Sequence, residues 1–230
     1  MSDSGPIHLR PTTALAERVL LPGDPGRALA LAQSLLVAPL MFNHHRGLWG
    51  YTGTAQDGEP LTIQSTGMGG PSAAIVLSEL IALGVRRAIR VGTCGALSPD
   101  LALGDLVVAR ESICRDGASR ALGVGERVLA DPGLTDALIL AAPRAHAGPV
   151  VSVDLFYGAP LPADALGALA IEMESATLFA VGARAEIPVA CLLAVSDTFD
   201  AAGARERIDD ESLFDATEAL GAVAVAALSS

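Results

Sequence analysis

The sequence has no lysine, so arginine supplies all 15 of its positively charged side chains. This absence excludes Schiff-base catalysis and the phosphate-gripping lysine of a P-loop. Cysteine is also scarce: Cys94, Cys114 and Cys191 are widely spaced and indicate neither a disulfide framework nor a zinc site. We expect no metal, and a reducing cytoplasm suits such a chain.

Positive charge and long apolar runs are in short supply as well. The formal net charge is −11, and no basic cluster offsets it locally. Nucleic-acid phosphate would repel such a surface. Charges, glycines or prolines interrupt every apolar run before it reaches membrane-spanning length, and the N-terminal MSDSGPIHLRPTT lacks a signal-peptide pattern. The predicted partners therefore include neither nucleic acid nor a membrane.

Strand-like and helix-like runs alternate along the 230 residues, half of which are apolar. This alternation predicts a single α/β domain, 1–230, with a sheet covered by helices. The expected strands are 17–21, 48–55, 61–66, 87–92, 105–109, 149–153 and 189–195. The expected helices are 25–36, 70–84, 133–141, 173–185 and 209–228. Residues 115–147 are rich in Gly, Ala and Pro and give few other signals.

The stretch RVLLPGDPGRALA, residues 18–30, joins an expected strand to an expected helix. Asp24 and Pro25 have the types preferred at a helix cap and first helical position. The unpaired N–H groups of that turn, the small Gly23 and the charge of Arg27 outline an anion site. The alternative is an ordinary turn whose arginine faces water.

A second stretch, RAIRVGTCGAL, places Arg90 inside an apolar strand that ends near Thr93. A half-buried arginine needs an anionic partner. That partner is either a ligand or an internal carboxylate, and the sequence leaves both readings open. Cys94 is expected to be a small buried residue.

Two carboxylates interrupt the apolar segment LAIEMESATLFAVG. In extended chain Glu172 and Glu174 share one face, and Met173 lies on the other. Sugar hydroxyls would satisfy the carboxylates, and so would a helix N-terminus just beyond. Both readings stay open for Glu172, whereas Glu174 favours the ligand.

A fourth stretch, CLLAVSDTFD, ends a buried strand at Ser196 and Asp197. Ligands gather beyond the carboxyl ends of strands in α/β sheets, so this is an expected place for a catalytic carboxylate. Asp197 would alternatively cap a turn or a short helix, which is the commoner fate of such an aspartate.

Taken together, these motifs resemble those of the nucleoside phosphorylase family, which contains the hexameric purine nucleoside phosphorylases and the uridine phosphorylases. The matching motifs, in order, are LPGDPGRA, NHHRGLWGYTG, STGMGGPSAAI, RVGTCGAL, VDLFYGA, IEMESATLFAVGA and AVSDTFD. The resemblance covers about residues 6–200 and implies a central mixed, twisted sheet flanked by helices. It also implies a homo-oligomer, most commonly a hexamer, whose active sites are shared between subunits.

The resemblance assigns site residues position by position. The phosphate-binding positions are Gly23, Arg27, Arg46, Arg90 and Thr93. The ribose-binding positions are His8, Met68, Met173 and Glu174. The base-binding positions are Phe156, Glu172, Ser196 and Asp197, of which Glu172 has the least certain role. His8 and Arg46 match residues that family members lend to the site of an adjacent subunit.

The implied reaction is phosphate-dependent cleavage of the N-glycosidic bond of a purine nucleoside, with phosphate as co-substrate and no cofactor. Asp197 matches the general acid that assists departure of the base at N7. DLFYGAP lacks the Gln and Arg with which uridine phosphorylases read uracil, although MESATL is closer to the uridine enzymes. Uridine phosphorylase and a phosphate-independent nucleosidase are the alternatives, and the three phosphate-type arginines disfavour the nucleosidase.

One position departs from the family pattern. Family members that accept adenosine carry an arginine in the helix after the Ser-Asp motif, where it pairs with the aspartate. Counting from Asp197 puts Asp210 there. Arg205 or Arg207 is expected to replace that arginine only if the intervening loop is rearranged.

Overall fold

Eleven strands form one sheet in the computed structural model, which describes residues 5–157, 167–199 and 204–229. The strands are β1 (Arg18–Leu21), β2 (Leu36–Asn43), β3 (Gly50–Ala55), β4 (Pro60–Gln64), β5 (Arg87–Ala96), β6 (Leu106–Arg115), β7 (Arg127–Leu129), β8 (His146–Val153), β9 (Ala170–Glu172), β10 (Val189–Phe199) and β11 (Arg205–Arg207). The helices are α1 (Pro25–Leu35), α2 (Gly70–Leu83), α3 (Gly117–Ala121), α4 (Pro132–Ala141), α5 (Ser175–Ala185) and α6 (Asp210–Leu228), with a 3₁₀ segment η1 (His45–Gly47). The predicted α/β class is confirmed.

The sheet is mixed, as expected, and part of it closes on itself. Its strands follow the order β11-β10-β6-β8-β9-β5-β1-β4-β3-β2, and β7 pairs with β6. A further pairing joins β10 to β5, so that β5, β10, β6, β8 and β9 form a closed ring. β10 runs parallel to β5 and antiparallel to β6. Closure leaves this part of the sheet without free edges.

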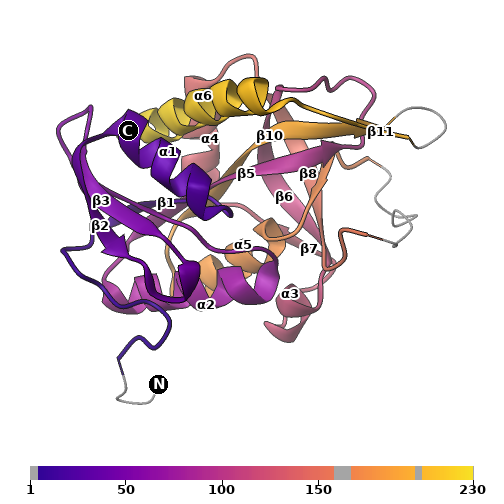
Figure 1. Ribbon diagram of the computed structural model, residues 1–230. Helices are drawn as coiled ribbons and strands as arrows, with labels where there is room; N and C mark the ends of the chain where they lie inside the picture. The colour runs from indigo at the N-terminus through magenta and orange to yellow at the C-terminus, as the bar shows by residue number, and fades with distance from the viewer. Residues whose placement is uncertain (1–4, 158–166, 200–203, 230) are drawn as a thin grey trace.

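Helices cover both faces of the sheet (Figure 1). On one face Leu31 of α1, Leu138 of α4 and Leu220 of α6 belong to one buried cluster. On the other, Leu77 of α2 and Phe179 of α5 belong to a second. Burying each such side chain contributes about 1.5–3 kcal/mol. None of the helices in the described part of the chain is long and apolar enough to cross a bilayer.

Helix α1 begins where the sequence predicts it. Asp24 accepts a hydrogen bond from the backbone N–H of Arg27 at 2.8 Å, and Pro25 occupies the first helical position. Proline has no N–H to leave unpaired there, and its fixed φ suits the first turn. The cap therefore fixes the place of Arg27, one turn beyond the end of β1.

The predicted strands and helices are present with shifted ends, and several short elements were not predicted. The strand predicted at 87–92 extends to Ala96, and that at 105–109 extends to Arg115. The missed elements are β2, β7, β9, β11 and α3. Most side chains of β2 are exposed and it contains Pro39, so it shows no alternating pattern. The other missed strands have three residues each, too few to show a period.

A buried ion pair ties β1 to the β3–β4 hairpin. Both terminal nitrogens of Arg18 lie 2.6 Å from a carboxylate oxygen of Asp57. Arg18 also donates to the carbonyls of Glu59 at 2.9 Å and Pro60 at 2.8 Å, and only 4% of its surface is exposed. Its hydrogen bonds hold the pKa of the Asp57 carboxyl well below the usual range.

Replacing Asp57 with Ala is expected to lower the free energy of unfolding by about 2 to 3 kcal/mol, because Arg18 loses its countercharge. The effect stays below that of a fully buried pair since the Asp57 side chain is 22% exposed. The folded-state pKa is depressed, so the stabilisation is complete above the unfolded pKa of about 3.9 and is lost as the pH falls below it.

Urea denaturation at neutral and acidic pH measures this effect. Asp136→Ala is the matched control, because Asp136 faces Arg110 at 3.8 Å in an exposed pair that contributes little. The interpretation fails if both substitutions cost the same at neutral pH. It also fails if the cost of Asp57→Ala does not shrink in acid.

Candidate active site

Several of the predicted site residues lie at or just beyond the carboxyl ends of four parallel strands. β4 and β5 flank β1 and run parallel to it, and β10 runs parallel to β5. Met68 follows β4, Arg27 follows β1, and Thr93 and Asp197 lie in the last part of β5 and β10. Neighbouring parallel strands end at one edge, and ligands of α/β sheets bind there. The sequence rule applied to each strand separately thus identifies one common place.

The turn after β1 brings backbone and charge close together. A Cβ on Gly23 would lie 3.3 Å from the carbonyl oxygen of Gly67 and 3.8 Å from Nη2 of Arg27, so the small residue permits this approach. Burial lowers the pKa of the Arg27 guanidinium, and the charge of Arg90 lowers it further. Two arginines whose charges repel each other in a partly buried place favour an anion between them.

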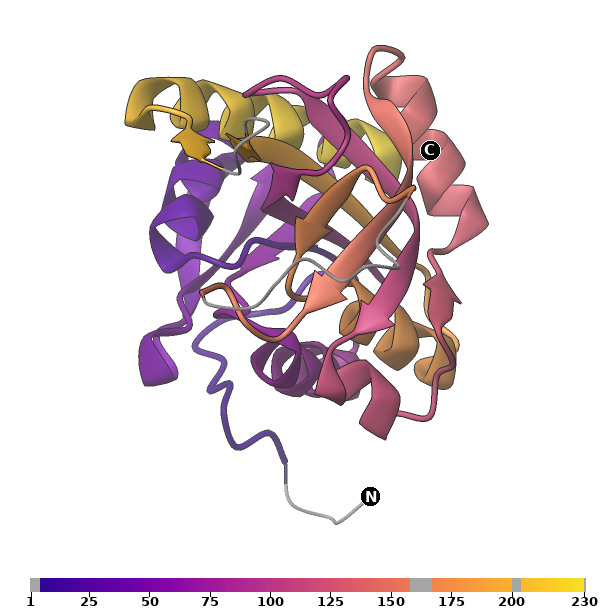
Figure 2. The ribbon, with the colours of Figure 1, turned by 90° about the vertical axis from the view of Figure 1, so that its right-hand side faces the viewer.

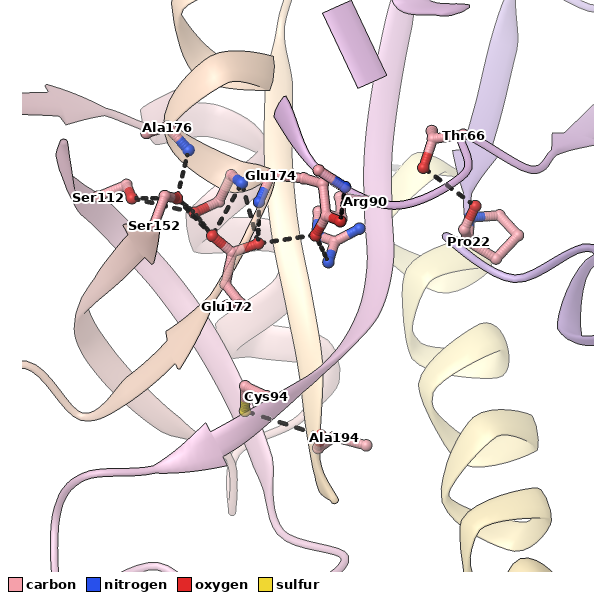
Figure 3. A network of polar contacts seen from close by, with 12 residues as sticks. Pro22, Thr66, Arg90, Cys94, Ser112, Ser152, Glu172, Glu174, Ala176 and Ala194 are labelled. Carbon is pink, nitrogen blue, oxygen red and sulfur yellow. Dashed lines mark hydrogen bonds and ion pairs between the residues drawn. The ribbon is translucent and has the colours of Figure 1, made fainter. Parts of the chain in front are cut away.

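Arg90 pairs with both carboxylates that the sequence singled out. Its Nε lies 3.1 Å from Glu172, and its Nη2 donates to Glu174 (Figure 3). Its Nη1 is buried and has no hydrogen-bond partner among the described residues. A Cβ on Gly92 would lie 2.8 Å from the Arg90 guanidinium, so a side chain there would displace it. The internal-carboxylate reading of Arg90 is confirmed, and the ligand reading stays a prediction that concerns its third nitrogen, Nη1.

Glu174 keeps capacity for a ligand. It directly precedes α5, and its carboxylate accepts from the N–H of Gly69 at 2.6 Å and from Arg90. A carboxylate has about four acceptor positions. Burial raises the pKa of the Glu174 carboxyl, while the charge of Arg90 opposes that rise. The remaining acceptor positions suit hydroxyl donors such as those of a sugar.

Glu172 is enclosed by protein donors instead. Its oxygens accept from the backbone N–H of Glu174 and of Ser175, each at 2.9 Å, as well as from Arg90. The two glutamates do not share one extended face, because β9 ends at Glu172 and Glu174 precedes the helix. These contacts match the alternative in which a helix N-terminus satisfies the carboxylate of Glu172. The base-binding role that the resemblance assigns to Glu172 stays a prediction.

Three buried serines that the sequence analysis missed complete the surroundings of Glu172. We call Ser112, Ser152 and Ser175 the serine cluster. Their hydroxyl oxygens lie 3.0 to 3.1 Å apart, and Figure 3 shows Ser112 and Ser152 beside the carboxylate. They come from β6, β8 and α5, so no local spacing links them. The only sequence signal is a serine within an apolar strand run at 150–153.

Asp197 lies in β10, and its two carboxylate oxygens have different surroundings. Its Oδ2 accepts from the hydroxyl of Ser196 at 2.7 Å, and its Oδ1 is buried without a hydrogen bond among the described residues. Within the same part of the chain no backbone N–H donates to the Asp197 carboxylate. Its contacts are therefore not those of a turn or helix cap.

Two arginines of β11 lie near Asp197, and the intervening loop that the sequence analysis expected to be rearranged includes residues 200–203, which lie outside the described part of the chain. β11 pairs antiparallel with β10, placing Arg207 opposite Asp197 and Arg205 opposite Phe199. Nε of Arg205 lies 3.0 Å and Nη1 of Arg207 3.6 Å from Asp197 Oδ1. The Arg205 guanidinium also lies 4.3 Å from the ring centre of Phe156. The hairpin thus groups the predicted acid and the predicted base-stacking aromatic around one arginine.

Other predicted residues are less closely tied to this group. Met68 is 86% exposed between two glycines of positive φ, and Thr93 and Met173 are half-buried. His8 Nδ1 lies 2.7 Å from Glu79 of α2. The backbone N–H groups of His8 and Leu9 also donate to Glu79, and Leu9 is buried, so the chain is held against α2 here. In Figure 2 the described start of the chain, in indigo, lies at the lower side of the molecule.

Arg46 is exposed in η1 and makes no ion pair within the described residues. No group of three or more His, Cys, Asp or Glu suited to a metal occurs in that same part of the chain. Cys94 is buried, as predicted, and burial raises the pKa of its thiol. The site's chemistry therefore rests on arginines and carboxylates rather than on the thiols.

Arginines and carboxylates thus lie at the carboxyl ends of parallel strands in a mixed α/β sheet, which is where enzymes of the α/β class bind their ligands. The profile of the family described as "Phosphorylase superfamily" matches residues 17–229. The chain belongs to this family, and the resemblance drawn from the motifs is confirmed.

Named relatives agree with the family match. A protein named purine nucleoside phosphorylase DeoD-type from Geobacillus kaustophilus is 35% identical over 207 residues, which cover 83% of this chain and 85% of that protein. Proteins of the same name from Lactococcus lactis subsp. cremoris and Oceanobacillus iheyensis are 34% and 37% identical, each over 80% of this chain and 82% and 83% of their own length. The similarity therefore spans most of every chain compared.

Proposed function

We propose that this chain is a purine nucleoside phosphorylase, which uses inorganic phosphate to cleave purine ribonucleosides or deoxyribonucleosides into free base and pentose 1-phosphate. The observation that supports this proposal most strongly is the buried Nη1 of Arg90. This nitrogen lacks a hydrogen-bond partner among the described residues, and the same guanidinium binds Glu174. An anion-binding nitrogen and a sugar-binding carboxylate are thereby joined in one contact. The names of the relatives support the purine enzyme.

Roles follow from the chemistry of each group. Arg90 and Arg27 neutralise phosphate and orient it toward the anomeric carbon, with Gly23 and Thr93 completing its shell. Glu174 accepts hydrogen bonds from the ribose hydroxyls. The remaining assignments are Arg46 for phosphate, His8, Met68 and Met173 for ribose, and Phe156, Ser196 and Asp197 for the base.

The reaction forms one bond and breaks one. A phosphate oxygen attacks C1′ as the C–N bond loosens through an oxocarbenium-like transition state, which the neighbouring phosphate charge stabilises. The bonding electrons pass into the purine. Asp197 gives a proton or hydrogen bond to N7 and thereby stabilises the departing base. Arg205 then stabilises the carboxylate that remains.

Replacing Arg205 with Gln is expected to lower kcat on adenosine roughly fivefold, and replacing Arg207 with Gln is expected to lower it less. Arg205 is the closer to Asp197 and its side chain is 33% exposed, against 61% for Arg207. Attraction weakens with distance and solvent. Steady-state kinetics of both variants measure the difference. A larger loss for Arg207→Gln would make Arg207 the functional partner.

Incubation with inosine, with and without phosphate, tests the proposed function. Base release that requires phosphate and yields ribose 1-phosphate supports it. Release without phosphate would indicate a nucleosidase, and no release a binding protein. A parallel arm with uridine tests the pyrimidine alternative, and adenosine and guanosine define the purine preference.

The proposed enzyme is a homo-oligomer, with a hexamer as the expected state. His8 is partly exposed near the N-terminus and Arg46 is exposed, which suits residues that complete a neighbouring subunit's site. All three cysteines are buried free thiols, as suits the proposed cytoplasmic location. Light scattering that shows a fully active monomer would contradict the shared-site proposal.

A further inference from the structure

The acceptor positions of Glu172 are all used by the protein. One oxygen accepts from the Ser175 N–H at 2.9 Å, the Ser175 hydroxyl at 2.7 Å and the Ser152 hydroxyl. The other accepts from Arg90 Nε at 3.1 Å and from the N–H groups of Glu174 and Ser175. The Glu172 side chain is 1% exposed. A carboxylate so occupied has no acceptor left for a substrate.

The serine cluster holds the Glu172 carboxylate on the side opposite to Arg90. A hydroxyl has one proton, and Ser152 gives its proton to Glu172. Ser152 must therefore accept from Ser112, 3.0 Å away, and it also accepts from the N–H of Ala176 at 2.9 Å. All three serines are fully buried. A fully satisfied buried network of this kind is rigid.

The rigidity passes to Arg90 through its planar guanidinium. Nε is held by Glu172 and Nη2 by Glu174, so the direction of Nη1 is determined by the other two nitrogens. Nη1 has no partner of its own among the residues described. Contacts that fix the Glu172 carboxylate therefore also fix the direction of Nη1, the nitrogen that binds the anion in the proposed function.

We infer that Glu172, held by the serine cluster, is a positioning residue that aims Nη1 of Arg90 at phosphate. This inference rests on the proposed function. In the proposed function the serine cluster contacts neither phosphate nor nucleoside, and it acts on Arg90 only through Glu172. Affinity for phosphate should then depend on serines that lie outside the site.

Ser152→Ala is the direct test, because it removes one donor to Glu172 and the acceptor of the Ala176 N–H. We expect the KM for phosphate to rise about tenfold, with a smaller change in kcat. Ser112→Ala is the second variant: it removes no direct contact to Glu172, and should give a smaller rise in the same direction.

Ser119→Ala is the matched control. Ser119 is fully buried and its hydroxyl donates to a buried carboxylate, that of Asp116, as Ser152 does to Glu172. Ser152→Ala and Ser119→Ala should both lower the melting temperature. Only the substitutions in the serine cluster should change the KM for phosphate. Equal phosphate KM values for Ser152→Ala and Ser119→Ala would overturn the inference. If Ser152→Ala does not fold, an unchanged phosphate KM in Ser112→Ala would overturn it.

Calorimetric titration with inorganic phosphate separates this inference from the proposed function. Wild-type protein that binds phosphate but cleaves no nucleoside would refute the function, and weaker binding by Ser152→Ala would still support the positioning role. Wild-type protein that cleaves nucleosides with phosphate, beside a Ser152→Ala variant of unchanged phosphate affinity, would refute the positioning role alone.

Discussion

Asp197→Asn is expected to lower kcat on adenosine by about 10²- to 10⁴-fold with little change in melting temperature. Asparagine keeps the size of the side chain and an oxygen to accept from Ser196, so the fold should tolerate it. It has no carboxyl proton to transfer to N7. Oδ1 of Asp197 is buried and lies 3.0 Å from Nε of Arg205, so the proposed acid shares this atom with an arginine that can stabilise the carboxylate left after proton transfer.

The loss should depend on the leaving group. Adenosine and inosine need N7 protonated or hydrogen-bonded as the bond breaks, whereas 7-methylguanosine already carries a positive charge in the ring. The variant should therefore approach wild-type turnover on 7-methylguanosine. Measuring kcat of both proteins on all three nucleosides gives the comparison.

Asp209→Asn provides the control for a purely structural aspartate. Asp209 caps α6 by accepting the N–H of Ser212 at 2.8 Å, and asparagine caps helices about as well, so this variant should keep wild-type kcat on all three nucleosides. Equal losses on all three nucleosides for Asp197→Asn would remove the acid from the mechanism. Catalysis would then rest on phosphate and oxocarbenium stabilisation alone.

The sequence predicts those parts of the site whose charged or polar groups cost free energy when they are buried. An arginine inside an apolar strand run demands an anion wherever it lies, so Arg90 stands out from its neighbours in the sequence. A capping aspartate followed by proline marks the start of a helix, and Asp24 lies where that rule puts it. Both signals are local and need no knowledge of distant contacts.

The parts that the sequence does not predict depend on pairing between distant segments. Glu172 and Glu174 differ by two positions, yet one is saturated by protein donors and the other keeps acceptor capacity. That difference comes from Ser152 on β8 and from the start of α5, which no spacing reveals. Likewise β11 has three residues and no period, although it brings Arg205 to Asp197.

Arg90→Ala is expected to raise the KM for phosphate by about 10²- to 10³-fold, within the range of about 2 to 5 kcal/mol found when one partner of a buried charge pair is removed. The substitution removes Nη1 and also the countercharge of Glu172 and Glu174. Arg27 remains, so high phosphate concentrations should restore part of the turnover. Phosphate saturation curves at saturating inosine measure the change.

The same substitution should alter the pH dependence. Burial raises the pKa of the Glu174 carboxyl and Arg90 opposes that rise, so without Arg90 the pKa moves further up. Protonated Glu174 accepts fewer hydrogen bonds from ribose. The acidic limb of kcat/KM should therefore move to higher pH in Arg90→Ala, since a higher pH is needed to ionise the group.

Arg110→Ala is the control for losing one arginine from this lysine-free chain, because Arg110 forms an exposed pair remote from these contacts. If Arg90→Ala lowers stability but leaves both the phosphate KM and the acidic limb unchanged, Arg90 is a structural link between Glu172 and Glu174. Phosphate would then depend on Arg27 and the turn after β1. A raised phosphate KM with the shifted limb identifies Arg90 as the group that joins the phosphate and ribose parts of the site.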